Sequence, residues 1–282
     1  MSERSHLRNF VLLWIALSAA LEVVVVVVLG HDIPPGNMTN DTRAQHDVIV
    51  TLTAIALPVL AMVWSYLAYA AVNFRAKRGG PLEDGAPDRG HGRLQLAWVA
   101  ITACMVLGLA AYGTIDLLSG AGGSGVGSGE GSNPLAKPAN ASKAVQVQVI
   151  GQQWVWTFRY PAYGGVETPT LEIPVNTDVE FHVTSLDVVH SFWAIELGVK
   201  ADAVPGADNV AFVTASRTGS FQVRCSELCG LWHGHMDTTG RVVSASAFKH
   251  WIAGQQTKYA GVTKQLPPYS TSYYPVPIRN GG

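Results

Sequence analysis

Three apolar runs constrain this chain most strongly, because each is long enough to cross a lipid bilayer. They cover residues 10–30, 48–72 and 94–118. At about 1.5 Å per residue, a helix of each length reaches the roughly 30 Å of the hydrocarbon core. The two later runs exceed that length and can span with some tilt. We therefore expect up to three transmembrane helices in the first 120 residues.

The first run also has features of a secretory signal, which is removed after export. It follows Arg4 and Arg8, and small residues occur at positions 18–20. The apolar part of a signal is usually about 7–15 residues long, however, and the valine block at 23–28 continues beyond those small residues. We favour a retained helix over a cleaved signal.

The charges of the connections predict the orientation. Residues 31–46 contain one arginine, Arg43, whereas residues 73–93 contain five basic residues: Arg75, Lys77, Arg78, Arg89 and Arg93. Basic connections stay in the cytoplasm. The second connection is therefore predicted to be cytoplasmic, and everything after residue 118 to lie outside. We therefore expect a multi-pass protein of a bacterial cell membrane, with its C-terminal domain on the extracytoplasmic side.

Composition excludes some classes of protein. The net charge of −1 argues against a nucleic-acid partner, which usually needs a basic face. Only 14% of the residues are charged, and the mean hydropathy is +0.19, as expected when part of the chain lies in lipid. Three cysteines are too few for a disulfide-rich scaffold.

The pattern of residues changes after the third run. A Gly/Ser-rich stretch reads as a linker, and alternation of apolar and polar residues then predicts short strands, typical of a β-sandwich or barrel. Positions 247–256 predict a short helix. We predict five segments: a first membrane helix at 1–31, a transmembrane hairpin at 32–120, the linker at 121–142, an extracytoplasmic β domain at 143–264, and an irregular tail at 265–282.

Twelve residues near the end of the β pattern gather potential metal ligands. Residues 225–236 read Cys-Ser-Glu-Leu-Cys-Gly-Leu-Trp-His-Gly-His-Met. The two cysteines could form a disulfide outside the membrane. Cysteine and histidine at short spacing are also common zinc ligands. Methionine weighs against zinc, because a thioether is a recurrent weak ligand of copper in electron-transfer sites.

The second cysteine distinguishes two kinds of copper site. A mononuclear site of this type needs one thiolate, so Cys225 or Cys229 would be surplus. Two thiolates can instead bridge two copper ions, and that arrangement requires one more histidine. His190 follows a predicted strand and is the candidate that completes this set.

These motifs, in order, resemble subunit II of cytochrome c oxidase. The resemblance rests on Gly-Gln-Gln-Trp-Val-Trp at 151–156, His-Ser-Phe-Trp at 190–193, Gly-Val-Lys-Ala-Asp-Ala-Val-Pro-Gly at 198–206 and the 225–236 motif, and it extends over about residues 42–258. It implies a transmembrane hairpin before a cupredoxin-like Greek-key barrel with the binuclear copper centre called Cu(A).

The resemblance also implies a role for each site residue. Cys225 and Cys229 would be the bridging thiolates, and His190 and His233 the terminal imidazoles. The weak ligands would be Met236 and the backbone carbonyl of Glu227, whose side chain would reach a magnesium or manganese ion. Trp154 would be the entry point for electrons from cytochrome c.

The function implied is that of an oxidoreductase subunit in the respiratory chain. Two copper ions would accept electrons from cytochrome c and pass them to haem in subunit I, where oxygen is reduced and protons are translocated. Acidic residues at 167–208, with Asp187 and Asp202 as the candidates, would dock the basic cytochrome. Alternatives are the Cu(A) subunit of a nitric oxide reductase and a membrane-tethered copper-binding module.

Three positions in the chain depart from expectation. Many family members have a glutamate at the entrance of a proton path where this chain has Gln95, and an aromatic residue where it has Val155. Glu22 places a carboxylate inside the first apolar run, where charge is costly and often functional. The sequence assigns no role to Glu22.

Overall fold

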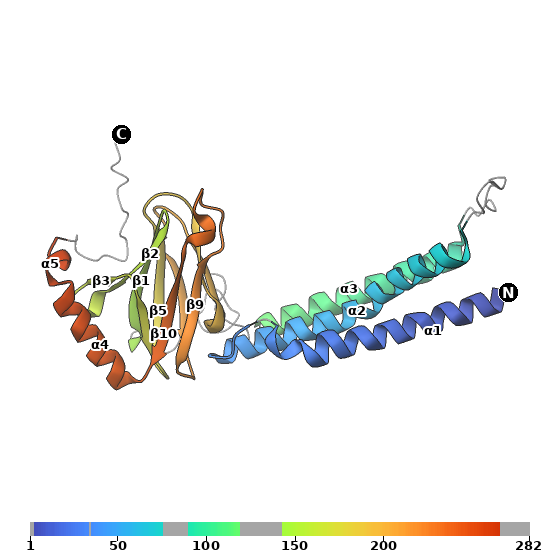
Figure 1. Cartoon of the computed structure of the whole chain (residues 1–282), viewed down its shortest axis with the longest axis horizontal. Coiled ribbons are helices and arrows are strands. Elements are labelled where there is room, and N and C mark those ends of the chain that lie inside the picture. The colour runs from blue at the N-terminus through green and yellow to red at the C-terminus, as the bar shows by residue number, and fades with distance from the viewer. Residues whose placement is uncertain (1–2, 34, 76–89, 119–142, 266–282) are drawn as a thin grey trace. The chain divides into compact units, whose positions relative to one another are not determined.

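The computed structural model describes residues 3–33, 35–75, 90–118 and 143–265 (Figure 1). The chain divides into two compact units. The helical unit contains Met1–Pro34 and His46–Thr114, and the β unit contains Pro35–Gln45 and Ile115–Gly282. The predicted linker and nearly all of the predicted tail lie outside the described residues. The predicted order of membrane helices followed by an all-β domain is confirmed.

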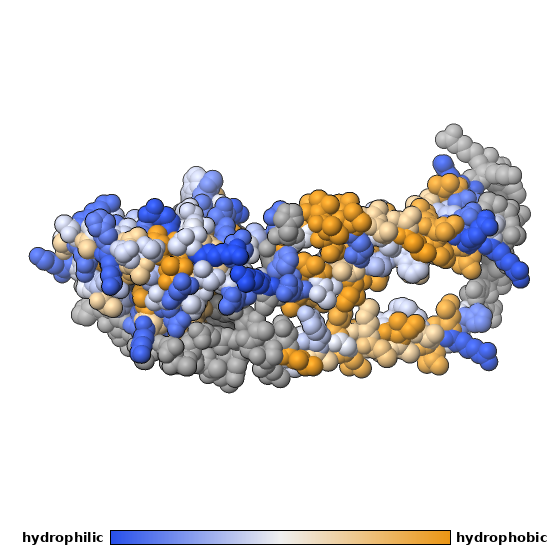
Figure 2. Space-filling model, turned by 90° about the horizontal axis from the view of Figure 1, so that it is seen from below, coloured by the Kyte–Doolittle hydropathy of each residue, from blue (hydrophilic) through white to orange (hydrophobic). Residues whose placement is uncertain are grey.

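Helices in the first part of the chain match the three apolar runs. They are α1 (Glu3–Leu21), which continues as the π-helix η1 (Glu22–Val28), α2 (Asn40–Asn73) and α3 (Gly92–Leu118). Three stretches are long and apolar enough to cross a membrane: Arg4–Val28, Gln45–Asn73 and Gly92–Ile115. Figure 2 shows hydrophobic residues over much of their surface.

Two polar contacts join α1 to α2. The indole Nε1 of Trp14 donates to the backbone oxygen of Pro58 at 2.8 Å, and His6 Nδ1 lies 2.9 Å from the Tyr69 hydroxyl. Such bonds stabilise helix pairs in lipid by about 1 kcal/mol each. The first helix therefore packs on the second through specific side chains as well as through apolar surface.

The end of α1 widens into a π-helix at Glu22, and six consecutive valines follow. Branching at Cβ crowds the preceding turn of an α-helix, and we attribute the wider turn to this valine run. Among the described residues, Glu22 has no hydrogen-bond or ion-pair partner.

The β unit is a sandwich of two five-stranded sheets. One sheet has the order β3-β2-β1-β5-β8 and the other the order β4-β10-β9-β6-β7. The strands are β1 (Val145–Gln152), β2 (Val155–Tyr160), β3 (Val166–Thr168), β4 (Leu171–Pro174), β5 (Asp178–Ser185), β6 (His190–Ala194), β7 (Val199–Ala203), β8 (Asn209–Thr214), β9 (Gly219–Cys225) and β10 (Asp237–Val243).

Alternation along these strands explains the core. In β1, Val147 and Val149 are fully buried, and they lie in register with Phe181 and Val183 of the parallel strand β5. Inward-facing residues of both sheets make one apolar cluster. Strands β3, β6 and β7 were not predicted. Strand β6 reads His-Ser-Phe-Trp-Ala and is buried at four of its five positions. A strand buried on both faces loses the alternating signal.

Helix α4 (Ala245–Lys258) lies beside the sandwich and extends two residues beyond the predicted helix at each end (Figure 1). Its N-cap is Ser244, whose hydroxyl accepts from the backbone N–H of Ala247 at 3.2 Å. This bond satisfies an otherwise unpaired donor of the first turn. Phe248 and Ile252, one turn apart, face the core and are buried.

A short segment that includes the start of α2 packs on the β sandwich. Met38 is 5% exposed and belongs to the core cluster. Its backbone oxygen accepts from the N–H of Ser216 at 2.8 Å, and Gln45 Nε2 donates to the Gly198 oxygen at 3.0 Å. Thr39 Oγ1 donates to the Leu197 oxygen at 3.2 Å. This Pro35–Gln45 strap is therefore part of the β unit, although it lies between two membrane runs in the sequence.

Replacing Gly240 with alanine should destabilise the sandwich. An added Cβ would lie 2.2 Å from the ring of Phe221, which is 1% exposed and has no room to move. Overpacking of this kind costs about 1–3 kcal/mol. Thermal unfolding followed by near-ultraviolet circular dichroism should show a lower midpoint.

The control is Gly254→Ala on α4, where nothing lies within 4 Å of an added Cβ. That change should raise the midpoint slightly, because alanine favours helix over glycine by about 1 kcal/mol. Equal midpoints for the wild type and Gly240→Ala would contradict the packing argument.

Candidate metal centre

The loops that carry the predicted ligands meet at one end of the sandwich. Strand β6 begins at His190 and β9 ends at Cys225, and these two strands pair antiparallel with Phe192 opposite Cys225. In the other sheet, β1 and β5 run parallel, so Gly151 and Ser185 end at the same level. The hydrogen bond from the Leu186 N–H to the Gly151 oxygen joins the loops that follow them.

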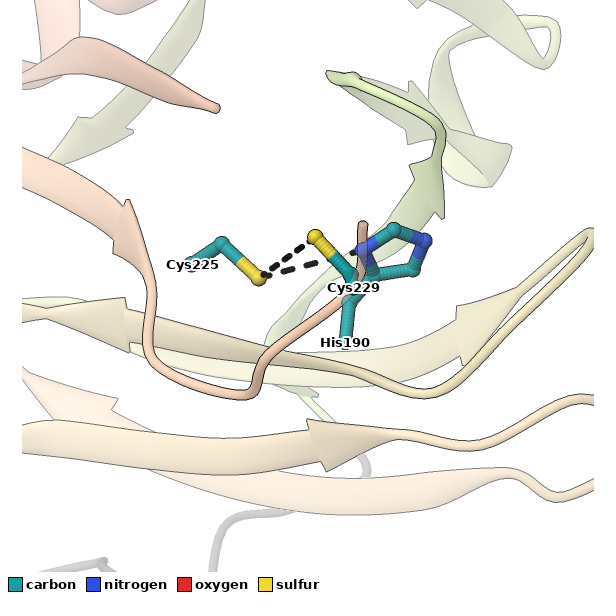
Figure 3. A group of neighbouring side chains, drawn as sticks. All are labelled: His190, Cys225 and Cys229. Atoms are coloured by element: carbon teal, nitrogen blue, oxygen red, sulfur yellow. Dashed lines mark hydrogen bonds between the residues drawn. The ribbon is translucent and has the colours of Figure 1, made fainter. Parts of the chain in front are cut away.

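The two cysteine sulfurs lie close together but are not bonded (Figure 3). Cys225 Sγ is 3.7 Å from Cys229 Sγ, whereas a disulfide bond is about 2.05 Å long. Both side chains are buried. The structure therefore holds two free thiols facing each other, and the disulfide considered from the sequence is not formed.

His190 lies beside these sulfurs, as predicted. Its Nδ1 is 3.8 Å from Cys225 Sγ, and His190 with the two cysteines forms a compact group able to hold a metal ion (Figure 3). The ring is fully buried. A Cβ at Gly151 would come within 3.0 Å of its Cδ2, so glycine is needed there to admit the imidazole. Gly151 was not among the predicted site residues.

The other three predicted donors converge on the same sulfurs. The backbone oxygen of Glu227 is 3.2 Å from Cys225 Sγ. His233 Nδ1 is 3.5 Å and Met236 Sδ 3.9 Å from Cys229 Sγ. Met236 is 1% exposed, so its thioether faces the interior. Four predicted donors thus surround the pair of sulfurs that completes the set of six, while the Glu227 side chain is exposed.

Trp154 and Gln153 hold the loop of Cys229 from the other sheet. Both side chains donate to the Cys229 backbone oxygen, Gln153 Nε2 at 2.8 Å and Trp154 Nε1 at 3.2 Å. Gly230 permits this approach: its φ is +116°, and a Cβ would lie 3.2 Å from the Trp154 ring. The predicted entry tryptophan therefore contacts the backbone of a predicted metal ligand, and its ring is half-buried.

Asp187, a candidate docking residue in the sequence, contacts a predicted metal ligand. Its carboxylate accepts from His190 Nε2 at 2.9 Å and from the backbone N–H groups of Gln153 and Val188, both at 2.7 Å. It thus joins the β1–β2 turn to a predicted metal ligand. Asp202 is exposed on β7 and stands in register with Ser191, next to His190.

The pKa values of the two thiols are shifted in opposite directions. Burial raises the pKa of Cys225, but hydrogen bonds from the His190 ring and from nearby backbone outweigh burial, so the pKa falls below its ordinary value. Burial raises the pKa of Cys229, and the neighbouring Cys225 raises it further. One proton therefore leaves easily and the second does not. A bound metal ion would stabilise both thiolates.

The donor set fits copper better than zinc. Two thiolates, two imidazoles and a thioether are soft ligands, and methionine is a recurrent weak ligand of copper electron-transfer centres. Structural zinc sites are closed by four cysteine or histidine ligands, which would leave Met236 without a role.

Comparisons with known proteins point to one family of oxidase subunits. Residues 166–243 match the family model described as cytochrome c oxidase subunit II, periplasmic domain. The chain is 30% identical to cytochrome c oxidase subunit 2 of Thermostichus vulcanus over 243 residues, which cover 73% of this chain and 72% of the relative. It is 26% identical to the subunit of Synechocystis over 291 residues, covering 90% and 86%.

A solved structure is also similar over the β domain. The periplasmic domain of subunit II of cytochrome oxidase from Bradyrhizobium japonicum is 33% identical. The similarity covers 41% of this chain and 95% of that chain, with a TM-score of 0.40.

With Cys104 replaced by serine, the metal-free protein should lose its two remaining thiol protons in separate steps. Ultraviolet absorbance of thiolates should show a first step below the ordinary thiol range, from Cys225, and a second above it, from Cys229, because of the opposite pKa shifts. Cys225→Ser should abolish the low step and bring the remaining one closer to the ordinary value. A single step near the ordinary thiol pKa would contradict the arrangement of these side chains.

Proposed function

Because the chain belongs to the cytochrome c oxidase subunit II family, we propose that its β domain holds two copper ions that relay electrons from cytochrome c to the haem-bearing subunit I. Family membership makes the chain a subunit of a haem–copper oxidase, with membrane helices and a cupredoxin-like sandwich outside the cytoplasm. The observation that carries the proposal is the convergence of four donors, two imidazoles, a thioether and a backbone oxygen, on the paired sulfurs of Cys225 and Cys229.

The ligands in this proposal are those expected from the sequence. Cys225 and Cys229 would hold the ions as bridging thiolates, His190 and His233 as terminal imidazoles, and Met236 and the Glu227 oxygen as weak ligands. When bound, copper supplies one-electron redox chemistry. The chain supplies a rigid frame: the donors come from strand ends and a loop tied by backbone bonds, such as Cys225 N–H to the Met236 oxygen at 3.0 Å. A rigid frame suits electron transfer, because little has to move between the oxidised and reduced states.

Asp187 positions one imidazole of this frame. Its bond to His190 Nε2 fixes the ring so that Nδ1 faces the sulfurs. Partners of this kind orient metal-bound histidines and tune the metal. This role accounts for the bonds that the Asp187 carboxylate makes to His190 and to the Gln153 backbone, and we assign the docking of cytochrome c to the exposed Asp202 near the same end.

Trp154 offers a short route into the centre. Its indole bonds to the oxygen of Cys229, so an electron arriving at the half-buried ring is one hydrogen bond from the backbone of a ligand. The exposed Glu227 side chain is the proposed ligand of a magnesium or manganese ion. Oxygen reduction and proton translocation belong to the assembled oxidase in this proposal.

Copper binding is tested with the full-length protein by electron paramagnetic resonance. The copper-loaded protein should show hyperfine splitting from two equivalent copper nuclei, because the bridging thiolates share the unpaired electron between them. Cys229→Ser removes one bridge and should give splitting by a single nucleus.

Cys104→Ser is the matched control, since Cys104 is exposed on α3 and belongs to no cluster of ligands. This variant should keep the two-copper signal. A single-nucleus signal from the wild type would refute the binuclear assignment.

Electron entry is tested by the rate at which cytochrome c reduces the copper-loaded protein. Trp154→Phe keeps an aromatic ring but loses the bond to Cys229, so reduction should slow while the resonance spectrum is unchanged. Asp202→Asn should slow reduction mainly at low salt, because salt screens charge steering.

The control for the first change is Trp193→Phe, at an outward-facing position of β6 without a hydrogen bond to the ligand loop. It should leave the rate unchanged. Equal rates for Trp154→Phe and the wild type would exclude this entry route, and an unchanged salt dependence in Asp202→Asn would exclude its docking role.

A further inference from the structure

A groove outside the metal centre lies between the C-terminal half of α4 and the strands β4 and β10. Its volume is about 460 Å³. The residues that matter for its chemistry are Trp251, Gln255 and Lys258 from α4, Tyr259 at the C-cap of that helix, Glu172 from β4 and Arg241 from β10. None of them contributes to the proposed copper site. The volume falls within the roughly 300–1,000 Å³ typical of small-molecule sites.

The groove carries an excess of positive charge. Arg241 pairs with Glu172, whose side chain is only 4% exposed, through Nε at 3.0 Å and through Nη2. This pair neutralises the one acidic side chain. The Lys258 ammonium lies 5.0 Å from the ring centroid of Tyr259 and has no carboxylate partner in the described part of the chain. The helix dipole stabilises a lysine in the last turn. That effect alone does not explain why a second cation, Arg241, lines the same groove.

The side-chain groups left available in the groove are mainly hydrogen-bond donors. Gln255 Oε1 already accepts from Thr168, which leaves the amide NH2 to donate. A guanidinium has five N–H groups, and the Arg241 side chain is 57% exposed after its bonds to Glu172. The indole N–H of Trp251 has no acceptor among the described residues. Donors without acceptors favour a ligand that brings negatively charged oxygens.

Aromatic rings form the rest of the wall. Trp251 packs edge-on against Tyr160 with ring centroids 5.5 Å apart, so a buried residue holds it in place. Trp251 and Tyr259 are both half-buried and line the groove. A flat apolar body can stack against such rings, and a few polar groups then fix its orientation.

We propose that this groove binds a planar organic anion, with its ring on Trp251 and Tyr259 and its carboxylate or phosphate on Lys258 and Arg241. This site is independent of the proposed copper relay. It gives the domain a way to recognise a small soluble molecule.

The test is titration calorimetry of the full-length, detergent-solubilised protein with naphthalene-2-carboxylate. The wild type should bind one equivalent, and the uncharged naphthalene-2-carboxamide should bind at least tenfold more weakly. Lys258→Gln should weaken carboxylate binding about tenfold, which corresponds to the loss of one charge-assisted bond.

Lys249→Gln is the matched control, since Lys249 is exposed on the same helix and does not line the groove. It should bind as the wild type does. The proposal is overturned if the wild type does not bind the carboxylate, if acid and amide bind equally, or if both lysine variants lose the same affinity. The copper resonance spectrum should be identical in all three proteins.

Discussion

The metal end of this molecule depends on one carboxylate that holds two loops together. Asp187 accepts from the backbone of Gln153 and from the ring of His190, so the turn that carries Trp154 and the imidazole share one anchor. The side chains of Gln153 and Trp154 then fix the carbonyl of Cys229. Through this chain of bonds, the turn that carries the predicted entry residue is tied to the loop that carries predicted ligands.

Different interactions stabilise the two units of the chain. In the helical unit, the apolar surface suits lipid, and specific contacts such as Trp14 to Pro58 add direction to the packing. In the β unit, the hydrophobic effect fills the space between two sheets, and polar groups are tolerated at the strand ends because they bond to one another. A soft-metal centre needs this second environment, since the interior keeps water away from the thiols.

The sequence predicted much of this arrangement, and particular residues show why. Spans in the membrane follow from run length and strands such as β1 follow from alternation, and both signals depend on neighbours in the chain. The ligand set came from motif spacing and family resemblance, and the structure brings all six donors together. The bond between Asp187 and His190 was not foreseen, because a carboxylate in an acidic stretch of sequence looks the same whether it faces solvent or a histidine. Gly151 and Gly230 were not foreseen either, since their importance lies in close approaches between strands far apart in sequence.

The Pro35–Gln45 strap has a consequence for the folding unit itself. Met38 fills part of the sandwich core, yet more than a hundred residues and two membrane runs separate it from β1. The β unit is therefore built from two separate segments of the sequence. A fragment that starts at the first strand would leave a side-chain-sized void and unpaired backbone groups where the strap belongs. Its natural complement is an eleven-residue peptide, supplied separately, that restores the missing piece of core.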